Sequence, residues 1–138
     1  MAKVFLGGTC NESTWRNEVI SKLTIDYFNP VVPDWTEDCQ KEEIKQRQSC
    51  DFCLYVITPS MKGVYSIAEA VEDSIKRPIS TVFCYTNYDG KKFSKEQIKS
   101  LKQVGIMIEN NGAKSFNNLD DVCMYLNKKS GWKNPFSK

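Results

Sequence analysis

One stretch decides the fold: Phe52-Cys-Leu-Tyr-Val-Ile-Thr-Pro-Ser-Met-Lys-Gly-Val-Tyr-Ser-Ile-Ala-Glu-Ala70. Residues 52–57 are an almost unbroken apolar run, rich in β-branched and aromatic side chains, which is typical of a central parallel strand covered on both faces. After a turn around Gly63, Ser66 and Glu69 have the spacing of a capping box, which predicts a helix start. The apolar face of that helix would carry Ile67, Val71 and Ile75. Ligands of open α/β sheets bind at such strand-to-helix junctions.

Glu69 has two interpretations. In a capping box it would only satisfy a backbone N–H at the start of its own helix. In a first helical turn at the carboxyl edge of the sheet, it would be a carboxylate held ionised by the helix dipole and able to act as a nucleophile. The spacing alone leaves both interpretations open.

The composition is that of one compact domain. The chain has 138 residues, of which 26% are charged and 41% hydrophobic, so we expect a single domain over residues 1–138. Residues 128–138 are expected to form a tail, with Trp132 and Phe136 as docking points. The net charge is +2, with the two signs interspersed, which gives no electrostatic footprint for a nucleic-acid partner.

The sequence contains no apolar run of the roughly 20 residues that a membrane span needs, and no secretory signal at its start. We therefore expect a cytoplasmic protein with no membrane partner. The six cysteines are spread through strand and helix patterns, so we expect reduced and mostly buried thiols. Cys50 and Cys53 form a C-x-x-C pattern, but no second pair completes a metal site.

The chain contains no histidine. This excludes Ser-His-Asp and Cys-His catalysis and every histidine-ligated metal centre. Acid and base chemistry near neutral pH must then come mainly from carboxylates.

The first strand is expected over residues 3–8 and ends in the pair Gly7-Gly8, followed by Thr9. Paired glycines there indicate either a close approach of the backbone to a ligand or a tight turn. The next helix is expected to be capped by Asn11 or Ser13, with an apolar stripe of Trp15, Val19, Ile20 and Leu23. Arg16 in that helix is either exposed or reaches an anionic group of a ligand.

A second strand over residues 25–32 is broken by Pro30, which favours an edge position. Asp34 and Trp35 follow it. Either the two residues bind a planar base, by hydrogen bonds and stacking, or Trp35 is a hydrophobic staple for the next helix. Thr36 is the expected N-cap of a charged helix that ends near Ser49. Asp51 begins the central strand, where a charge needs solvent or a partner.

In the second half, a fourth strand is expected over residues 79–85. Ser94 and Gln97 form a capping box for a short helix with Ile98 and Leu101 facing inward. The fifth strand is assigned to residues 106–108, with residues 114–116 as the competing segment. Asn117 or Asn118 caps the last helix, whose buried stripe is Leu119, Val122, Cys123 and Leu126.

Strands and helices thus alternate along the chain. This pattern predicts an α/β fold with a doubly wound, mostly parallel five-stranded sheet and helices on both faces, of flavodoxin-like or Rossmann-like topology. Right-handed crossovers would bring four segments to one edge of the sheet: residues 7–9, Asp34-Trp35, residues 58–60 and residues 66–69.

Together these segments resemble the nucleoside 2-deoxyribosyltransferase-like proteins. The resemblance extends from Val4 to about Tyr85 and is specific only as a set. The set consists of Val4–Thr9 with Trp15-Arg16, Phe28–Val32 with Asp34-Trp35, Asp51, and Gly63–Ala70.

The resemblance implies that Glu69 attacks the anomeric carbon of a 2-deoxyribosyl group, releases the base, and passes the sugar to another base or to water. Asp51 would help to protonate the departing base. Gly7, Gly8 and Thr9 would border the sugar and base, and Asp34 and Trp35 would line the base pocket. The resemblance implies no metal and no organic cofactor, a role in nucleotide salvage, and a dimer or larger homo-oligomer in which a neighbouring subunit completes the site.

The chain departs from the family pattern at three positions. Phe5 stands where the transferases carry a tyrosine whose hydroxyl orients the glutamate. Gly63 stands where an aspartate is common, and Val71 replaces a glycine. Tyr65 and Ser66, beside Gly63 in the expected substrate site, are candidates to replace the missing hydroxyl.

Three functions therefore compete. The first is base exchange by a nucleoside 2-deoxyribosyltransferase-like enzyme. The second is hydrolysis of a deoxynucleoside 5′-monophosphate by an N-glycosidase, with Arg16 near the phosphate. The third is sequestration of a nucleotide without catalysis, which the departures at Phe5 and Gly63 favour.

Overall fold

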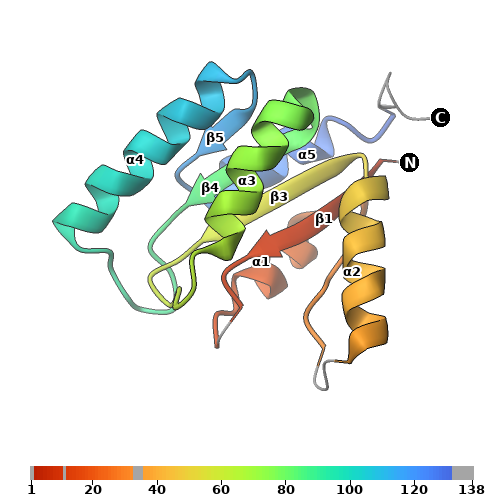
Figure 1. Cartoon of the computed structure of the whole chain (residues 1–138), viewed down its shortest axis with the longest axis horizontal. Coiled ribbons are helices and arrows are strands. Elements are labelled where there is room, and N and C mark those ends of the chain that lie inside the picture. Colours follow the sequence, from red (N-terminus) through yellow and green to blue (C-terminus); the bar gives the residue numbers. More distant parts are fainter. Residues whose placement is uncertain (1, 11, 33–35, 132–138) are drawn as a thin grey trace.

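One parallel sheet of five strands, in the order β2-β1-β3-β4-β5, forms the centre of the described chain (Figure 1). The computed structural model describes residues 2–10, 12–32 and 36–131. The strands are β1 (Lys3–Gly8), β2 (Asp26–Phe28), β3 (Phe52–Ile57), β4 (Thr81–Tyr85) and β5 (Lys114–Phe116). This order is that of flavodoxin-like sheets, and β2 has the expected edge position.

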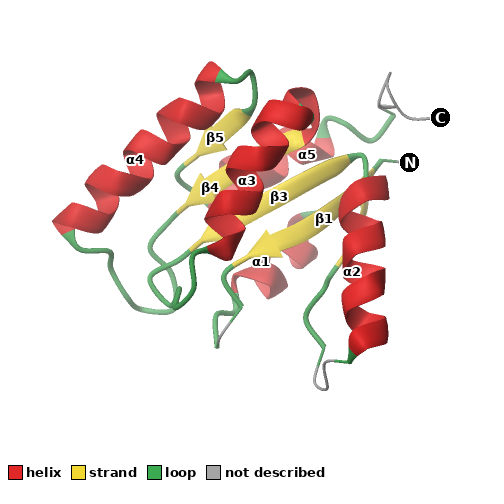
Figure 2. Ribbon diagram, viewed as in Figure 1, coloured by secondary structure: helices red, strands yellow, loops and turns green. Residues whose placement is uncertain are grey.

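Five α-helices alternate with these strands: α1 (Trp15–Lys22), α2 (Glu37–Ser49), α3 (Tyr65–Lys76), α4 (Lys95–Asn110) and α5 (Leu119–Asn127). Figure 2 shows α1 and α5 behind the sheet and the other three helices in front of it. The predicted doubly wound α/β fold is therefore confirmed, with every strand pair parallel. No helix in the described chain is long and apolar enough to cross a membrane.

Strand β3 is buried at all six residues, as its sequence predicts. Because side chains alternate across a strand, β3 supplies both cores. Leu54 and Val56 pack with Trp15 and Val19 of α1 and with the predicted stripe of α5. On the opposite face, Cys53, Tyr55 and Ile57 pack in a cluster with Phe83, Leu101 and Ile108.

Three expected helix starts are confirmed by their capping hydrogen bonds. Thr36 accepts from the N–H of Cys39 and Asn118 from that of Asp121. Ser94 and Gln97 form the reciprocal capping box. The first helix differs, because its N-cap is Thr14 without a side-chain cap, while the Ser13 hydroxyl instead bonds Asp89 at 2.6 Å.

The fifth strand is β5 over residues 114–116, so the assignment to residues 106–108 was wrong. Those residues continue α4, which runs for 16 residues to Asn110. Gly105 allows this helix to lie close to β5, because a Cβ there would meet Ser115 Oγ at 2.8 Å. Ile98 is 38% exposed and does not face inward, whereas Leu101 does. Strand β4 begins only at Thr81, because residues 78–80 form a 3-10 turn, η1.

Gly8 lies against β3 with a φ of +118°, and a Cβ there would lie 2.1 Å from the carbonyl oxygen of Val56. We expect Gly8→Ala to lower the free energy of unfolding by at least about 2 kcal/mol, because both the backbone conformation and the space exclude a side chain. Gly63→Ala is the matched control, since a Cβ there meets nothing within 4 Å. Urea unfolding of both variants tests this; equal midpoints would contradict it.

Candidate functional site

A cavity of about 470 Å³ opens at the carboxyl edge of the sheet. It is lined by Cys10, Pro30, Val31, Val32, Gln40, Glu43, Ile44, Arg47, Tyr65 and Glu69. The chain leaves β1 toward β2 on one side and reaches β3 on the other, so the cavity lies at the switch point of the sheet. Its volume falls within the range of small-molecule sites, roughly 300–1,000 Å³.

A second cavity, of about 140 Å³, adjoins the first and shares Cys10 and Tyr65 with it. Its other lining residues are Gly8, Thr9, Ile57, Met61, Lys62, Gly63 and Ser66. Tyr65, which lines both cavities, is 74% exposed. The two cavities together offer adjoining compartments for a two-part ligand.

Glu69 lies in the second turn of α3, as the fifth residue of that helix. The helix begins at Tyr65 with Val64 as N-cap and no side-chain capping bond, and its first turn has no acidic residue. The capping box predicted for Ser66 and Glu69 is therefore wrong, because the helix starts two residues too early for Ser66 to be its N-cap. Two residues of the predicted apolar stripe, Ile67 and Val71, pack against the core, but Ile75 is 65% exposed and does not. The buried positions of α3 are Ala70, Asp73 and Ser74.

The Glu69 side chain is 18% exposed and lines the larger cavity. Burial raises the pKa of its carboxyl group; Arg47 lowers that pKa, while Glu43, Asp73 and Glu72 raise it further, and the net direction is upward. The position in the second turn explains why the helix dipole does not govern this group, since that field fades beyond the first turn. Glu69 is thus free of any capping role and faces space that a ligand can occupy.

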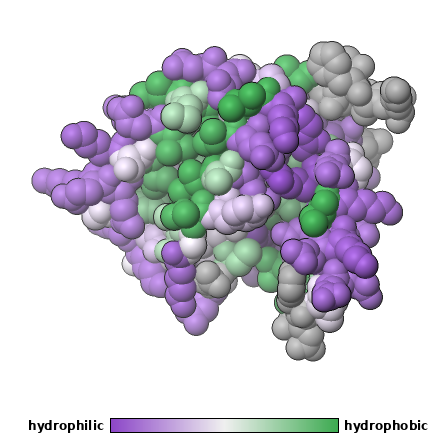
Figure 3. All heavy atoms as spheres, viewed as in Figure 1, coloured by the Kyte–Doolittle hydropathy of each residue, from purple (hydrophilic) through white to green (hydrophobic). Residues whose placement is uncertain are grey.

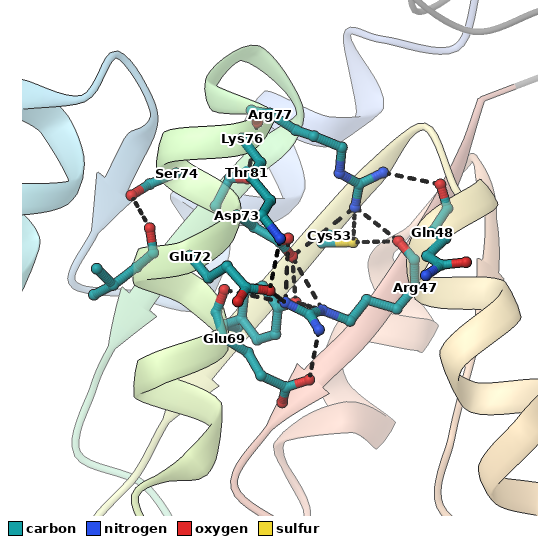
Figure 4. A network of polar contacts seen from close by, with 12 residues as sticks. Arg47, Gln48, Cys53, Glu69, Glu72, Asp73, Ser74, Lys76, Arg77 and Thr81 are labelled. Carbon is teal, nitrogen blue, oxygen red and sulfur yellow. Dashed lines mark hydrogen bonds and ion pairs between the residues drawn. The ribbon is translucent and has the colours of Figure 1, made fainter.

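Arg47 connects Glu69 to the interior of the protein (Figure 4). One terminal nitrogen of its guanidinium lies 3.4 Å from Glu69 Oε2. Its Nε donates to the Tyr55 hydroxyl at 2.9 Å, and Tyr55 donates in turn to Asp73 at 2.6 Å. Burial opposes the charge of Arg47, but Tyr55, Asp73 and Glu69 outweigh burial and raise its pKa. Arg47 therefore stays charged.

One face of α2 was missed by the sequence reasoning. The cavity residues Gln40, Glu43, Ile44 and Arg47 recur at helical spacing, yet α2 has no fully buried residue. Its outer surface is also mainly hydrophilic (Figure 3). The sequence of α2 did contain a signal for this face: polar and apolar residues are mixed along a stripe at positions i, i+3, i+4 and i+7. Such a stripe lines a cavity when it is too polar for the core.

Asp51 lies at the opposite edge of the sheet from the cavity. It precedes the first residue of β3, and its carboxylate accepts a hydrogen bond from the N–H of Lys3 at 2.9 Å. The structure therefore does not bring Asp51 and Glu69 together. The reason is topological, because residues before a parallel strand and residues after it lie at different edges.

Arg16 is neither exposed nor directed at a cavity. It is only 4% exposed, and its guanidinium donates to the carbonyl oxygens of Leu6, Gly8 and Thr9 at 3.0, 3.3 and 2.7 Å. Burial lowers its pKa. The interpretation of Arg16 as an exposed side chain is therefore wrong, because its guanidinium holds the loop after β1.

The remaining predicted residues divide between scaffold and cavity. Gly7 packs on the ring of Tyr55, where a Cβ would lie 2.8 Å away. Thr9 accepts from the N–H of Thr58 at 3.0 Å. Five of the predicted site residues line the smaller cavity: Gly8, Thr9, Gly63, Tyr65 and Ser66. The predicted pair Asp34 and Trp35 lies outside the described residues, as does the predicted cap Asn11.

A family model described as nucleoside 2-deoxyribosyltransferase like matches residues 1–88, well over half of the 138 residues. The chain belongs to this family. No curated protein and no solved structure gives a significant match.

The nucleoside 2-deoxyribosyltransferase-like segment includes every described residue that lines the two cavities. Helix α4, β5 and α5 lie beyond it. Within the described ranges, no group of three or more cysteine, aspartate or glutamate side chains is placed to hold a metal ion. The chemistry that the cavity offers its ligand is that of carboxylates beside one arginine.

Proposed function

We propose that this protein cleaves the N-glycosidic bond of a 2′-deoxynucleoside or deoxynucleotide and passes the deoxyribosyl group to another base. The observation that carries the proposal is the placement of Glu69, which lines a ligand-sized cavity at the switch point without a capping role. Membership of the nucleoside 2-deoxyribosyltransferase-like family supports the same substrate class.

The cavity walls suit the two halves of such a substrate. Pro30, Val31 and Ile44 form an apolar wall, and the exposed ring of Tyr65 offers a face for stacking on a planar base. The carboxylates of Glu43 and Glu69 are hydrogen-bond acceptors for sugar hydroxyls and base N–H groups.

In the proposed reaction, a carboxylate oxygen of Glu69 attacks C1′ of the sugar. The bond from C1′ to the base nitrogen breaks, its electron pair leaves with the base, and an acid supplies a proton to that nitrogen. A second base then attacks C1′ of the glycosyl ester, which frees the Glu69 carboxylate and returns the proton. Two displacements at C1′ restore the original anomeric configuration.

Glu43 is the proposed acid in place of Asp51. It is the second carboxyl group that lines the cavity, and a carboxyl group in its protonated form can supply the proton that the departing base needs. It comes from α2 and Glu69 from α3, so a substrate can lie between the two groups. Asp51, bound to the backbone of Lys3 at the other edge of the sheet, is not available for this step.

Replacing Glu43 by glutamine is expected to slow cleavage of a natural deoxynucleoside by about a hundredfold, the usual contribution of a general acid. The loss should nearly vanish with a deoxyriboside whose leaving group needs no proton, such as p-nitrophenolate. Initial rates on both substrates measure this. An equal loss on both would show that Glu43 acts in some other way.

The proposal itself is tested with a panel of deoxynucleosides and deoxynucleoside monophosphates, each incubated with and without a second free base. Mass spectrometry should detect the exchanged nucleoside only when the acceptor base is present. Wild type and Glu69→Gln both inert across the whole panel would reject the proposal, and binding by calorimetry in that case would favour sequestration without catalysis.

Transfer to water is the second candidate. The cavity residues Val31, Ile44 and Tyr65 are 49%, 52% and 74% exposed, so water reaches the region where an acceptor base would bind. Hydrolysis predicts free base and free deoxyribose without any acceptor. The expected homo-oligomer and the cytoplasmic location stay predictions; light scattering after size-exclusion chromatography tests the first.

A further inference from the structure

The Glu69 carboxylate has one polar partner in the described part of the chain, and that partner is Arg47. The contact joins an Arg47 terminal nitrogen to Glu69 Oε2 at 3.4 Å. Neither Tyr65 nor Ser66, the side chains considered as replacements for a missing hydroxyl, bonds Glu69 among the described residues. Phe5 cannot do so either, because its side chain has no hydrogen-bonding group, and its ring is buried and stacked on Phe28 at 5.9 Å.

Arg47 is itself fixed on the side away from the cavity. Its Nε donates to the Tyr55 hydroxyl and lies 3.3 Å from Asp73, whose other oxygen lies 3.2 Å from a terminal nitrogen. Tyr55 is fully buried and Asp73 is 5% exposed, so both anchors belong to the rigid interior. A guanidinium presents its donors in one plane, so fixing one edge sets the direction of the other.

We propose that Arg47, anchored by Tyr55 and Asp73, is a positioning residue that orients the Glu69 carboxylate toward the bound sugar. The inference rests on the proposed function for its catalytic meaning. Its structural content is independent: Tyr55 on β3 and Asp73 on α3 fix a cation on α2, and that cation directs a carboxylate into the cavity.

The charges around Glu69 determine what the removal of Arg47 does. From α2, Arg47 lowers the pKa of Glu69 and Glu43 raises it; from α3, Asp73 and Glu72 raise it, in addition to burial. Arg47 is thus the cation that lowers the pKa of Glu69, against burial and the charges of Glu43, Asp73 and Glu72, which raise it. Without it, the pKa of Glu69 rises and the fraction of ionised carboxylate at a given pH falls.

The test is a titration of Glu69 by carbon NMR in protein labelled at the glutamate carboxyl carbons, with the signal assigned by its loss in Glu69→Gln. We expect Arg47→Gln to move the midpoint upward by about one pH unit. Tyr55→Phe, which keeps the ring and removes one anchor, should move it in the same direction by less. Lys76→Gln is the control, because it removes a nearby cation that pairs with Glu72 and not with Glu69.

The kinetic readout separates positioning from binding. In an active enzyme, Arg47→Gln should lower kcat by tenfold or more with little change in KM, and should move the rising limb of the pH–rate profile to higher pH. Arg47→Lys should restore the position of that limb better than it restores kcat, because lysine keeps the charge and loses the planar fork.

An unchanged Glu69 midpoint in folded Arg47→Gln would overturn the inference. If that variant does not fold, an unchanged midpoint in Tyr55→Phe has the same weight. The titration needs no turnover. A lack of activity toward the whole nucleoside panel would therefore reject the proposed function, but it would not decide whether Arg47 orients Glu69.

Discussion

Replacing Glu69 by glutamine is expected to reduce turnover on the order of a thousandfold or more, because the amide cannot form the glycosyl ester. Substrate binding should change little, since the neutral side chain keeps its shape in a cavity whose other walls are intact. Single-turnover kinetics on a deoxynucleoside, together with calorimetric binding to the inactive variant, measure the two effects separately.

The same variant should not lose stability. Because the folded protein raises the pKa of Glu69, ionisation of this group is less favourable in the folded than in the unfolded state. The resulting penalty is absent below the ordinary glutamate pKa and complete above the raised one. At neutral pH, Glu69→Gln should therefore melt at the same temperature as wild type or higher. Lost activity with a clearly lower melting temperature would instead indicate misfolding.

For the wild type, the raised pKa of Glu69 predicts a rising acid limb in the pH–rate profile. The nucleophile must be ionised, so the rate should increase as pH rises through the pKa of Glu69, above the ordinary glutamate value. Measuring kcat/KM from pH 4 to 8 reports this midpoint for the free enzyme. A limb at or below the ordinary value would mean that another group controls the rate.

The fold could be predicted because its signals are local and agree with one another. The β3 run is rich in β-branched and aromatic residues and is closed by Thr58-Pro59, which favours a buried strand, and the caps at Thr36, Ser94 and Asn118 are where their side-chain chemistry puts them. The fifth strand was wrongly predicted at residues 106–108 because a short apolar run is compatible with either a strand or a buried helix segment. Their position late in a long helix resolves the ambiguity only in three dimensions.

The site was less predictable, because it depends on which charged groups meet across the chain. Glu69 stood out through its position after β3, but Arg47 lies 22 residues earlier, on a helix that the sequence marks only as charged. The family resemblance implied a role for Asp51 at the departing base, although its position before the strand already pointed to the amino edge of the sheet. Nothing in the sequence around Arg16 shows that three backbone carbonyl groups surround it.

Replacing Arg16 by methionine is expected to lower the free energy of unfolding by about 3 kcal/mol, the second large effect. Methionine approximates the length of the buried side chain but donates no hydrogen bond. It removes donors from the carbonyl groups of Leu6, Gly8 and Thr9 and ends the stacking of the guanidinium on Trp15 at 4.4 Å. Urea unfolding followed by tryptophan fluorescence measures the change.

The control for Arg16 is Lys22→Met on the same helix. The Lys22 side chain is 43% exposed and pairs with Asp120 and Glu18 at the surface, so its loss should change the free energy of unfolding far less than the loss of Arg16 does. This comparison also decides whether Arg16 binds a substrate phosphate or only holds the loop after β1. If Arg16→Met is as stable as Lys22→Met but binds deoxynucleotides more weakly than deoxynucleosides, Arg16 binds the phosphate of the substrate. If Arg16→Met is less stable and shows no such preference, the role of Arg16 is to hold the loop after β1.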